Sequence, residues 1–262
     1  MPELPEVEHA SRVLRKAIVG RTVRGVRILH RSHRRGLPPR DVARIRGATV
    51  TGVERRGKHQ LLTLDTGDTV VVHFRMTGDW LVEAGQPATS LPNYARVVIE
   101  LDDGMRVSLI DPRALSTVTV HRAGATSLPT VGPDAADPTV PVEVFGQALA
   151  KRRVAIKVAL LDQRVLAGVG NIYAAEALWL ARIDPRAVAS SLSKSRQRRL
   201  LDAIRAVLDK AQSIAGRYRD DRTERFEVYD REGQPCSRCG TAIRRIVQGG
   251  RSTYFCPHCQ RH

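Results

Sequence analysis

The sequence predicts an α+β chain built from two different halves. Residues 3–18 carry apolar side chains at helical spacing, and Gly20 stands where such a helix would end. From about residue 21 to residue 121, short apolar runs alternate with turns, as in an antiparallel sandwich or barrel. Beyond residue 141 the spacing is helical again, and four cysteines follow near the end. We therefore expect a helix and a β-sandwich, then a helical part and a metal-bound hairpin.

Seven runs in the first half have the length and composition of strands. Turn sequences such as Asp65-Thr66-Gly67-Asp68 separate them. The expected strands are Val23–Leu29, Thr49–Val53, His59–Leu64, Thr69–Phe74, Val97–Leu101, Met105–Ile110 and Thr117–His121.

A stretch rich in Ala, Gly, Pro, Thr and Asp, residues 123–141, is expected to link the two halves. Three helices are expected after it, at 143–161, 171–182 and 195–213. The segment 216–232 is polar and charged, and we expect a loop there before the hairpin.

The charge of the chain indicates a polyanionic partner. The formal net charge is +16 and the isoelectric point about 10.7, and only six of the 43 basic residues are lysine. The planar guanidinium of arginine suits bidentate contacts to phosphate, so nucleic acid is the expected partner. The alternative is an arginine-rich genome composition with no such partner. No stretch approaches 18 apolar residues and nothing marks export, so we expect no membrane association and a cytoplasmic protein.

The cysteines form two Cys-x-x-Cys pairs, a spacing typical of a tetrahedral zinc site. Two short strands, Thr241–Val247 and Ser252–Phe255, are expected between the pairs. Four sulfur ligands leave no position open for water, so one zinc ion is expected in a structural role. It would fix the hairpin tip, where Arg251 is a candidate for phosphate contact. The expected ligands are Cys236, Cys239, Cys256 and Cys259.

A glycine-rich segment in the helical half, Leu166–Tyr173, contains Asn171 where it could cap the following helix. Backbone N–H groups at a helix start can hold a phosphate. The alternative is an ordinary turn between helices, but Lys157 on the preceding helix favours phosphate.

Four separated motifs resemble those of the bacterial formamidopyrimidine-DNA glycosylases of the Fpg/Nei family. They are Pro2–Glu6, Arg56-Gly57-Lys58, Gly168–Tyr173, and the four-cysteine hairpin with Arg251. The resemblance implies an amino-terminal helix on a β-sandwich, a helix–two-turn–helix domain and a zinc finger. The implied divisions are a catalytic domain at 1–122, the linker at 123–141, a DNA-binding domain at 142–220 and the finger at 221–262.

The resemblance also implies excision of damaged bases followed by cleavage of the abasic site. The nucleophile would be the secondary amine of Pro2, exposed once Met1 is removed. An α-amino group has a reference pKa of about 8, against about 10.4 for lysine, so more of it is unprotonated at neutral pH. The alternative for Pro2 is a proline that merely starts a helix.

The other catalytic positions follow from the same resemblance. Glu3 would act as acid and base beside the sugar, and Glu6 would orient it or bind the sugar. Lys58 would contact the flanking phosphate and donate a proton, and Arg251 would serve the second elimination. The alternatives are acids that only complement the helix dipole, and ordinary surface cations.

Extrusion of the damaged nucleotide requires side chains that fill the gap in the duplex. Met76 and Arg113 match the positions that do this in the family, and Leu115 stands where relatives have phenylalanine. Ala114 replaces an arginine, and Tyr94-Ala95-Arg96 stands where relatives often have His-x-His. Further DNA contacts are expected from Tyr94, Arg152, Lys157 and Asn171.

The loop at 216–230 is also expected to be short. These departures leave the favoured lesion and the opposite base open, and they favour ring-opened purines or oxidised pyrimidines over 8-oxoguanine. The expected partner is damaged double-stranded DNA, bound by a monomer associated with the nucleoid. Two alternatives remain: a DNA-binding protein of the same fold that does not cut, and a zinc-ribbon accessory factor of transcription or translation. Neither explains Pro2 and Glu3.

Overall fold

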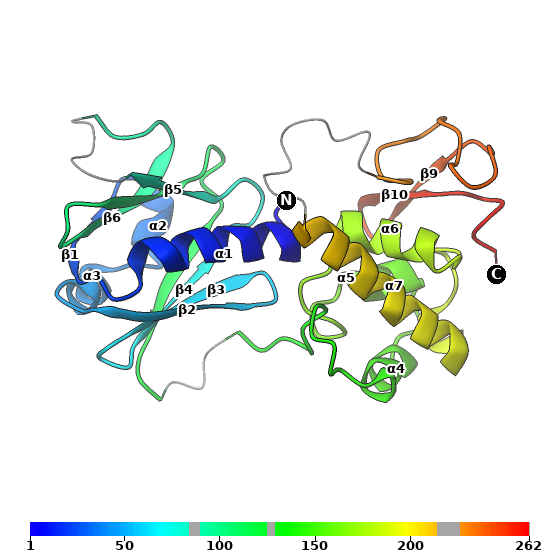
Figure 1. Cartoon of the computed structure of the whole chain (residues 1–262), viewed down its shortest axis with the longest axis horizontal. Helices are drawn as coiled ribbons and strands as arrows, with labels where there is room; N and C mark the ends of the chain where they lie inside the picture. Colours follow the sequence, from blue (N-terminus) through cyan, green and yellow to red (C-terminus); the bar gives the residue numbers. More distant parts are fainter. Residues whose placement is uncertain (84–89, 125–128, 214–225, 262) are drawn as a thin grey trace. The chain divides into compact units, whose positions relative to one another are not determined.

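The computed structural model describes residues 1–83, 90–124, 129–213 and 226–261. The chain divides into two compact units, Met1–Thr130 and Val131–His262, which are described separately below (Figure 1). None of the described helices combines the length and apolar composition that a membrane-spanning helix needs. The finer domain boundaries expected from the sequence stay predictions, and the one at residue 220 lies outside the described residues.

Helix α1, Leu4–Ile18, opens the first unit close to where the sequence predicts it. Glu3 is its N-cap and forms a reciprocal capping box with Glu6, which satisfies two N–H groups of the first turn. The helix ends at Val19, and Gly20 adopts the left-handed conformation expected after a helix (φ 81°). Its apolar stripe is buried, with Leu4, Val7, Ala10, Leu14, Ala17 and Ile18 between 0% and 5% exposed.

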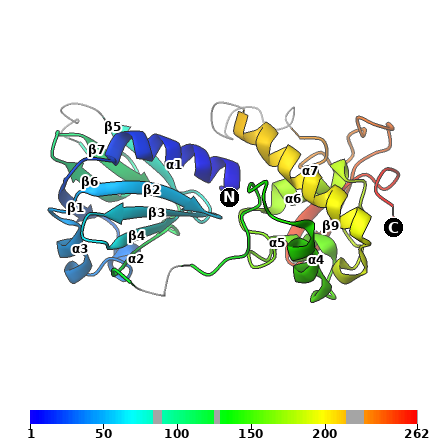
Figure 2. The same ribbon diagram turned by 60° about the horizontal axis from the view of Figure 1, so that its bottom comes forward.

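The described strands of this unit form two four-stranded antiparallel sheets that share one apolar core with α1 (Figures 1 and 2). One sheet has the order β1-β6-β7-β5, with strands Val23–Ile28, Ala95–Leu101, Arg106–Ile110 and Asp79–Glu83. The other has the order β2-β3-β4-β8, with strands Val50–Arg56, His59–Leu64, Thr69–His73 and Thr117–His121. The predicted sandwich is confirmed.

Strand β5 and two short helices were not predicted. Strand β5 is a sheet edge with only Asp79 and Trp80 buried, so its sequence lacks a clear alternation. Helices α2 (Arg31–Arg34) and α3 (Pro39–Ile45) follow β1 and are too short and too polar to show helical periodicity. After α2, Gly36 lies so close to β8 that an added Cβ would be 2.3 Å from the carbonyl oxygen of Val118.

The strand pairing brings the connecting loops of both sheets to one end of the sandwich. In the first sheet, Ile28 pairs with Val97, and Ile110 pairs with both Ala95 and Asp79. In the second, His59 pairs with His73, and His73 with Thr117. Because neighbours run antiparallel, the β2–β3 turn, the β4–β5 and β7–β8 connections, and the segments before β6 and after β1 share this end.

The second unit is largely helical. Its helices are α4 (Val142–Ala150), α5 (Ile156–Leu161), α6 (Asn171–Leu180) and α7 (Lys194–Ser213), with a 3-10 turn η1 at Ala189–Ser191. The single helix predicted over 143–161 is wrong, because residues 151–155 interrupt it. There Ala155 pairs with Val188 and Ile156 N–H donates to the Ala187 carbonyl, so a distant segment takes up the backbone bonds.

The carboxyl end of the expected linker 123–141 is hydrogen-bonded within the second unit. Gly132 N–H donates to the Gln163 carbonyl at 2.8 Å, and Ala135 N–H donates to that of Ala167 at 2.9 Å. Residues from Val131 onward therefore belong to the second unit.

Strands β9 (Arg244–Gln248) and β10 (Arg251–Phe255) form the predicted terminal hairpin. Its turn residues Gly249 and Gly250 both have positive φ, as a tight two-residue hairpin requires. The hairpin packs on α6 through a small core that includes Trp179, Cys236 and Tyr254.

The close approach at Gly36 gives a prediction about stability. Gly36→Ala should destabilise the first unit by about 1–3 kcal/mol, because the new methyl group meets backbone that cannot move aside. Gly52→Ala is the matched control, since an added Cβ there has open space and φ is not positive. Urea unfolding of both variants measures the difference. Equal stability of the two variants would contradict the close packing of the segment after α2.

Candidate functional site

Pro2 lies outside helix α1. The first helical position is Leu4 and the second is Pro5, so Pro2 precedes the N-cap Glu3. The alternative that Pro2 serves as a helix-starting proline is therefore wrong, and Pro5 takes that place. Glu3 is only 1% exposed, and its backbone N–H donates to Glu6 Oε2 at 2.8 Å. The two carboxylates are thus held together at the start of the chain.

Arg55 connects α1 to the turn that carries Lys58. Its Nε donates to Glu8 Oε2 at 2.9 Å and its Nη1 to the Gly57 carbonyl at 3.0 Å. Burial alone would raise the pKa of Glu8, but the hydrogen bonds and charges of Arg55 and Arg12 hold it below its usual value. Lys58 occupies the β2–β3 turn rather than a strand start and is 6% exposed.

Helix α1 runs along β2 with its amino end toward this turn. Arg15 Nε donates to the Val53 carbonyl at 2.8 Å, while Glu8, about two turns earlier in the helix, accepts from Arg55. Glu3 is five residues further, about 7.5 Å along the helix axis. Figures 1 and 2 both show the β2–β3 turn beside the amino end of α1. The geometry places Pro2, Glu3 and Lys58 at the same end of the sandwich.

Two histidines next to Lys58 were missed by the sequence reasoning. His59 and His73 face each other across β3 and β4, with ring centroids 4.7 Å apart. Burial, then the neighbouring His59, Arg75 and Lys58, lowers the pKa of His73 to about 3. His73 Nδ1 accepts from Arg75 N–H at 2.9 Å, which leaves the proton of the neutral ring on Nε2. His73 is therefore an uncharged donor near Lys58. A histidine at the end of a strand, just before the Met76 segment, was the available signal.

Asp111 ties the two loops that carry the expected gap-filling side chains. It is fully buried, and its carboxylate accepts from the Thr77 hydroxyl, from Arg113 N–H at 3.2 Å and from Ser116 N–H at 2.7 Å. Burial would raise the pKa of Asp111, but these donors hold it below its usual value. Asp111 was quoted in the sequence motif but given no role. The contact with Thr77, 34 residues away, shows that it fixes both loops together.

The gap-filling candidates lie exposed on these loops. Met76 is 39% exposed and Leu115 is 43% exposed. Arg113, two residues before Leu115, is exposed as well. Ala114 adopts a left-handed conformation (φ 51°), which turns the loop between Arg113 and Leu115. Large exposed apolar side chains on rigid loops are suited to insertion between bases.

Tyr94 and Arg96 support the same loop from the start of β6. Tyr94 is 58% exposed with φ 61°, and its ring lies 5.8 Å from the Arg96 guanidinium. Arg96 donates from Nε to the Asp111 carbonyl at 2.6 Å and from Nη2 to that of Pro112 at 3.0 Å. The residue pair that departs from the His-x-His pattern is therefore part of the loop's scaffold.

In the second unit, Asn171 and Lys157 meet the zinc hairpin. Asn171 Nδ2 donates to the Ser252 carbonyl at 3.0 Å, and Lys157 Nζ donates to Asn171 Oδ1 at 2.5 Å. The predicted N-cap role of Asn171 is wrong: Gly170 is the N-cap, and the Asn171 side chain bonds the hairpin instead. Lys157 is fully buried, so in this structure its ammonium positions Asn171 rather than facing solvent.

Arg251 is exposed and directly precedes Ser252, so the bond from Asn171 also fixes its place. Arg152 pairs with Asp162 at 2.8 Å. The DNA contacts expected from these residues stay predictions, as do the roles of the catalytic residues.

The four predicted zinc ligands come together at the base of the hairpin. The sulfur atoms of Cys236, Cys239, Cys256 and Cys259 all lie within 4.8 Å of one another. Two pairs are 3.9 and 3.5 Å apart. Zinc–sulfur bonds of about 2.3 Å in a tetrahedron separate the sulfurs by about 3.8 Å, whereas a disulfide needs about 2.05 Å.

Surrounding groups also fit thiolate ligands. Trp179 Nε1 donates to Cys236 Sγ at 3.4 Å, and the Arg238 guanidinium lies 3.6 Å from the Trp179 ring centroid. The site holds one structural zinc.

Comparison with protein families agrees with this geometry along the whole chain. Residues 1–118 match the model of the formamidopyrimidine-DNA glycosylase N-terminal domain, and residues 131–220 match that of its H2TH domain. Residues 233–261 match the zinc finger found in FPG and IleRS. The chain belongs to the formamidopyrimidine-DNA glycosylase family.

Individual relatives cover the chain fully. A formamidopyrimidine-DNA glycosylase of Rhizorhabdus wittichii is 39% identical and covers 100% of both chains. One from Chloroflexus aggregans is 41% identical, over 99% of this chain and 98% of the relative. Among solved structures, MutM in complex with DNA containing carbocyclic 8-oxo-G has a TM-score of 0.91 and 30% identity, covering 100% of both chains. MutM of Thermus thermophilus has a TM-score of 0.85 and 35% identity, over 99% and 98% of the chains.

Zinc removal gives the first prediction for the site. Cys239→Ser should lose the zinc and unfold the hairpin, because the fold of this small core depends on the metal. His258→Ala is the control, since His258 lies between two ligands but outside the sulfur cluster. Metal analysis and the near-ultraviolet signal of Trp179 report the two effects. Full zinc content in Cys239→Ser, or its loss in His258→Ala, would contradict the assignment.

The buried histidines predict acid sensitivity. The folded pKa of His73 is about 3, below the unfolded value of about 6.5, so the folded state binds fewer protons. Its stabilising effect is complete above about pH 6.5 and is lost as the pH falls toward 3. His73→Asn should therefore lose less unfolding free energy than the native chain between pH 7.5 and 4.5. Equal losses in urea titrations would show that His73 does not stay neutral.

Proposed function

We propose that this protein is a bifunctional base-excision repair glycosylase. It extrudes and excises oxidised or ring-opened bases from duplex DNA, then cleaves the abasic site by β,δ-elimination. The observation that carries the proposal is the family match over the whole length, together with a proline that stands outside α1 beside the buried Glu3.

The secondary amine of Pro2 attacks C1′ of the extruded sugar, and the base leaves with the bonding electrons and a proton. The nitrogen then loses its proton, the C1′–O4′ bond breaks, and O4′ takes up a proton. The product is an open-chain iminium, which stays positive because the amine is secondary. That charge draws electrons from the C2′–H bond, so removal of this proton expels the 3′ phosphate. A second elimination expels the 5′ phosphate, and hydrolysis of the remaining adduct frees Pro2.

Glu3 moves protons at the sugar, and its burial beside Glu6 limits its rotation. Lys58 is held in a tight turn by Arg55, which suits a group that must contact a phosphate and donate a proton. Arg251 serves the second elimination from the hairpin tip that zinc and Asn171 fix. The zinc supplies rigidity and no chemistry.

Duplex DNA is the partner, and Met76, Arg113 and Leu115 fill the gap left by the extruded nucleotide. Solved relatives support this, since Lactococcus lactis Fpg has been crystallised with abasic-site DNA and with Fapy-dG DNA. The DNA surface also includes Tyr94 and Arg152. Lys157 and Asn171 contribute to it by holding the zinc hairpin in place. We further propose that the protein acts as a monomer on nucleoid DNA.

The lesion preference is shifted toward ring-opened purines or oxidised pyrimidines. Leu115 can insert but cannot stack as an aromatic ring does, and Ala114 lacks a donor for an unpaired base. The loop at 216–230, also expected to affect this choice, lies mostly outside the described residues.

Borohydride trapping tests the proposal. The native protein should form a covalent complex with abasic DNA. Pro2→Gly or an amino-terminally extended chain should lose most of the trapped product, because neither offers the secondary amine that bonds to the sugar. Pro5→Ala is the matched control, since this proline lies inside α1. A protein that binds the duplex without any trapped product would be the non-cutting DNA-binding protein instead. In a separate excision assay on duplexes that each carry one lesion, strong excision of 8-oxoguanine only opposite cytosine would contradict the lesion preference.

A further inference from the structure

Arginines without acidic partners gather on and just after α2. Residues 31–46 contain one acid, Asp41, and six exposed arginines, of which Arg40 pairs with Asp41 and Arg44 with Asp68. The other four are Arg31, Arg34, Arg35 and Arg46. Several other arginines of this unit are paired with carboxylates, namely Arg12, Arg21, Arg27, Arg55 and Arg106. Among the described residues, no ion pair includes Arg31, Arg34 or Arg35.

Three guanidinium groups, those of Arg31, Arg34 and Arg35, therefore face solvent uncompensated. Such a cluster repels itself, and a polyanion that binds it gains the attraction without breaking an existing ion pair.

Buried contacts fix this cluster beside the loop that carries Arg113 and Leu115. His33, in the middle of α2, is 2% exposed, and its Nε2 lies 3.0 Å from Oγ of Ser116, which is 4% exposed. Leu29 N–H donates to the Arg96 carbonyl at 2.8 Å just before α2 begins. The α2 arginines are thus anchored on both sides to residues that support the 111–116 loop.

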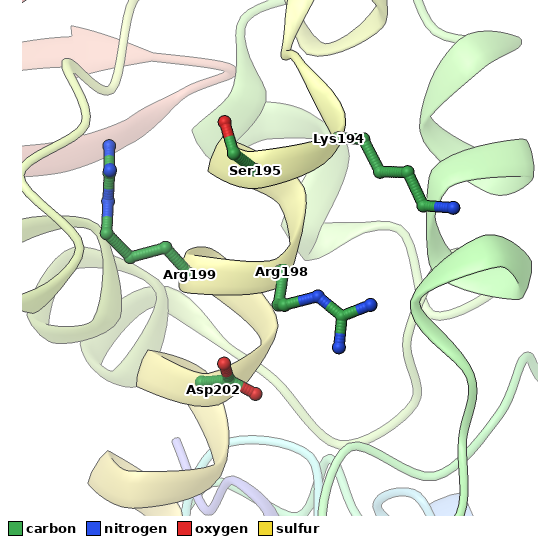
Figure 3. A pocket seen from close by; sticks show the side chains of 5 residues that line it. All are labelled: Lys194, Ser195, Arg198, Arg199 and Asp202. Carbon is green, nitrogen blue, oxygen red and sulfur yellow. The ribbon is translucent and has the colours of Figure 1, made fainter.

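A second basic surface of the chain differs in this respect. A hollow of about 550 Å³ at the start of α7 is lined by Lys194, Ser195, Arg198, Arg199 and Asp202 (Figure 3). There Lys194 pairs with Glu143 at 2.8 Å, and Arg199 Nε donates to the Ala181 carbonyl at 2.8 Å. Protein acceptors therefore already hold Lys194 and Arg199, and Asp202 lies among the lining side chains.

We propose that Arg31, Arg34 and Arg35 form an additional phosphate-contact surface for duplex DNA, adjoining the 111–116 loop. The inference rests on the proposed function, because the duplex is its partner. Phosphate contacts carry no sequence information, so these arginines bind undamaged and damaged DNA alike. They hold the duplex flank while Arg113 and Leu115 test the base stack.

The test compares two triple variants that each remove three positive charges. Arg31, Arg34 and Arg35 are changed to Gln in one, and Arg24, Arg40 and Arg46 in the other. The control arginines are also exposed. Arg24 lies at the start of β1, where Val23 pairs with Leu101, whereas Arg96 lies at the other end of these two strands. Equilibrium binding to a long undamaged duplex is measured over a range of salt concentrations.

The α2 triple should bind about 10- to 100-fold more weakly at about 0.1 M salt. The slope of log K against log salt should fall in magnitude by about two to three, since each lost phosphate contact removes about 0.9. The control triple should lose less than about threefold, with a slope change under about one. Changing the α2 arginines to Lys should restore most of the slope, which separates charge from misfolding.

Equal losses in the two Gln triples would overturn the proposal, since they would reflect net charge alone. An unchanged slope in the α2 triple would overturn it as well. Failure of the proposed function is seen separately, as an absence of borohydride trapping by the native protein, because duplex binding needs no chemistry.

Discussion

Antiparallel pairing in the two sheets is the constraint on which the site of the first unit depends. It brings the β2–β3 turn, the β4–β5 and β7–β8 connections and the start of β6 to one end of the sandwich. These segments come from sequence positions as far apart as residues 57 and 116. Two buried polar contacts then fix what the backbone brings together. Arg55 holds the turn of Lys58 to α1, and Asp111 holds the Met76 loop to the 111–116 loop. A site that must receive an extruded nucleotide needs this rigidity, because small displacements of catalytic groups cost large factors in rate.

The second unit reaches rigidity by a different route. Its hairpin is too small to bury an adequate core, so the four cysteines and zinc supply the stability that packing alone does not. Asn171 and Lys157 then fasten the edge of β10 to the start of α6 through a single carbonyl, that of Ser252. The two side chains thereby satisfy a carbonyl group of the hairpin and fix the position of the neighbouring Arg251. Binding chemistry and folding chemistry therefore share the same residues here.

Local patterns in the sequence predicted helix α1, most of the strands, the zinc ligands and helix α7, because each depends on spacing within a short stretch. What the sequence could not reveal depends on distant partners. The break after α4 exists because Ala155 pairs with Val188, and the role of Asn171 depends on Ser252, 81 residues away. His73 acquires its role only when β3 and β4 are paired, and Asp111 only when the β4–β5 and β7–β8 connections meet. The edge strand β5 and the short helix α2 lack a periodic signal, yet α2 carries the free arginines beside the loop. The family resemblance supplied residue roles that periodicity could not.

The central claim is that the ring nitrogen at residue 2 bonds to the sugar. Peptide mapping of the borohydride-reduced complex by tandem mass spectrometry tests it most directly, because it identifies the modified atom's residue rather than the effect of a substitution. The account predicts a deoxyribose remnant on Pro2 in a peptide that lacks Met1. A remnant on the Lys58 side chain, the other amine placed at this end of the sandwich, would contradict it.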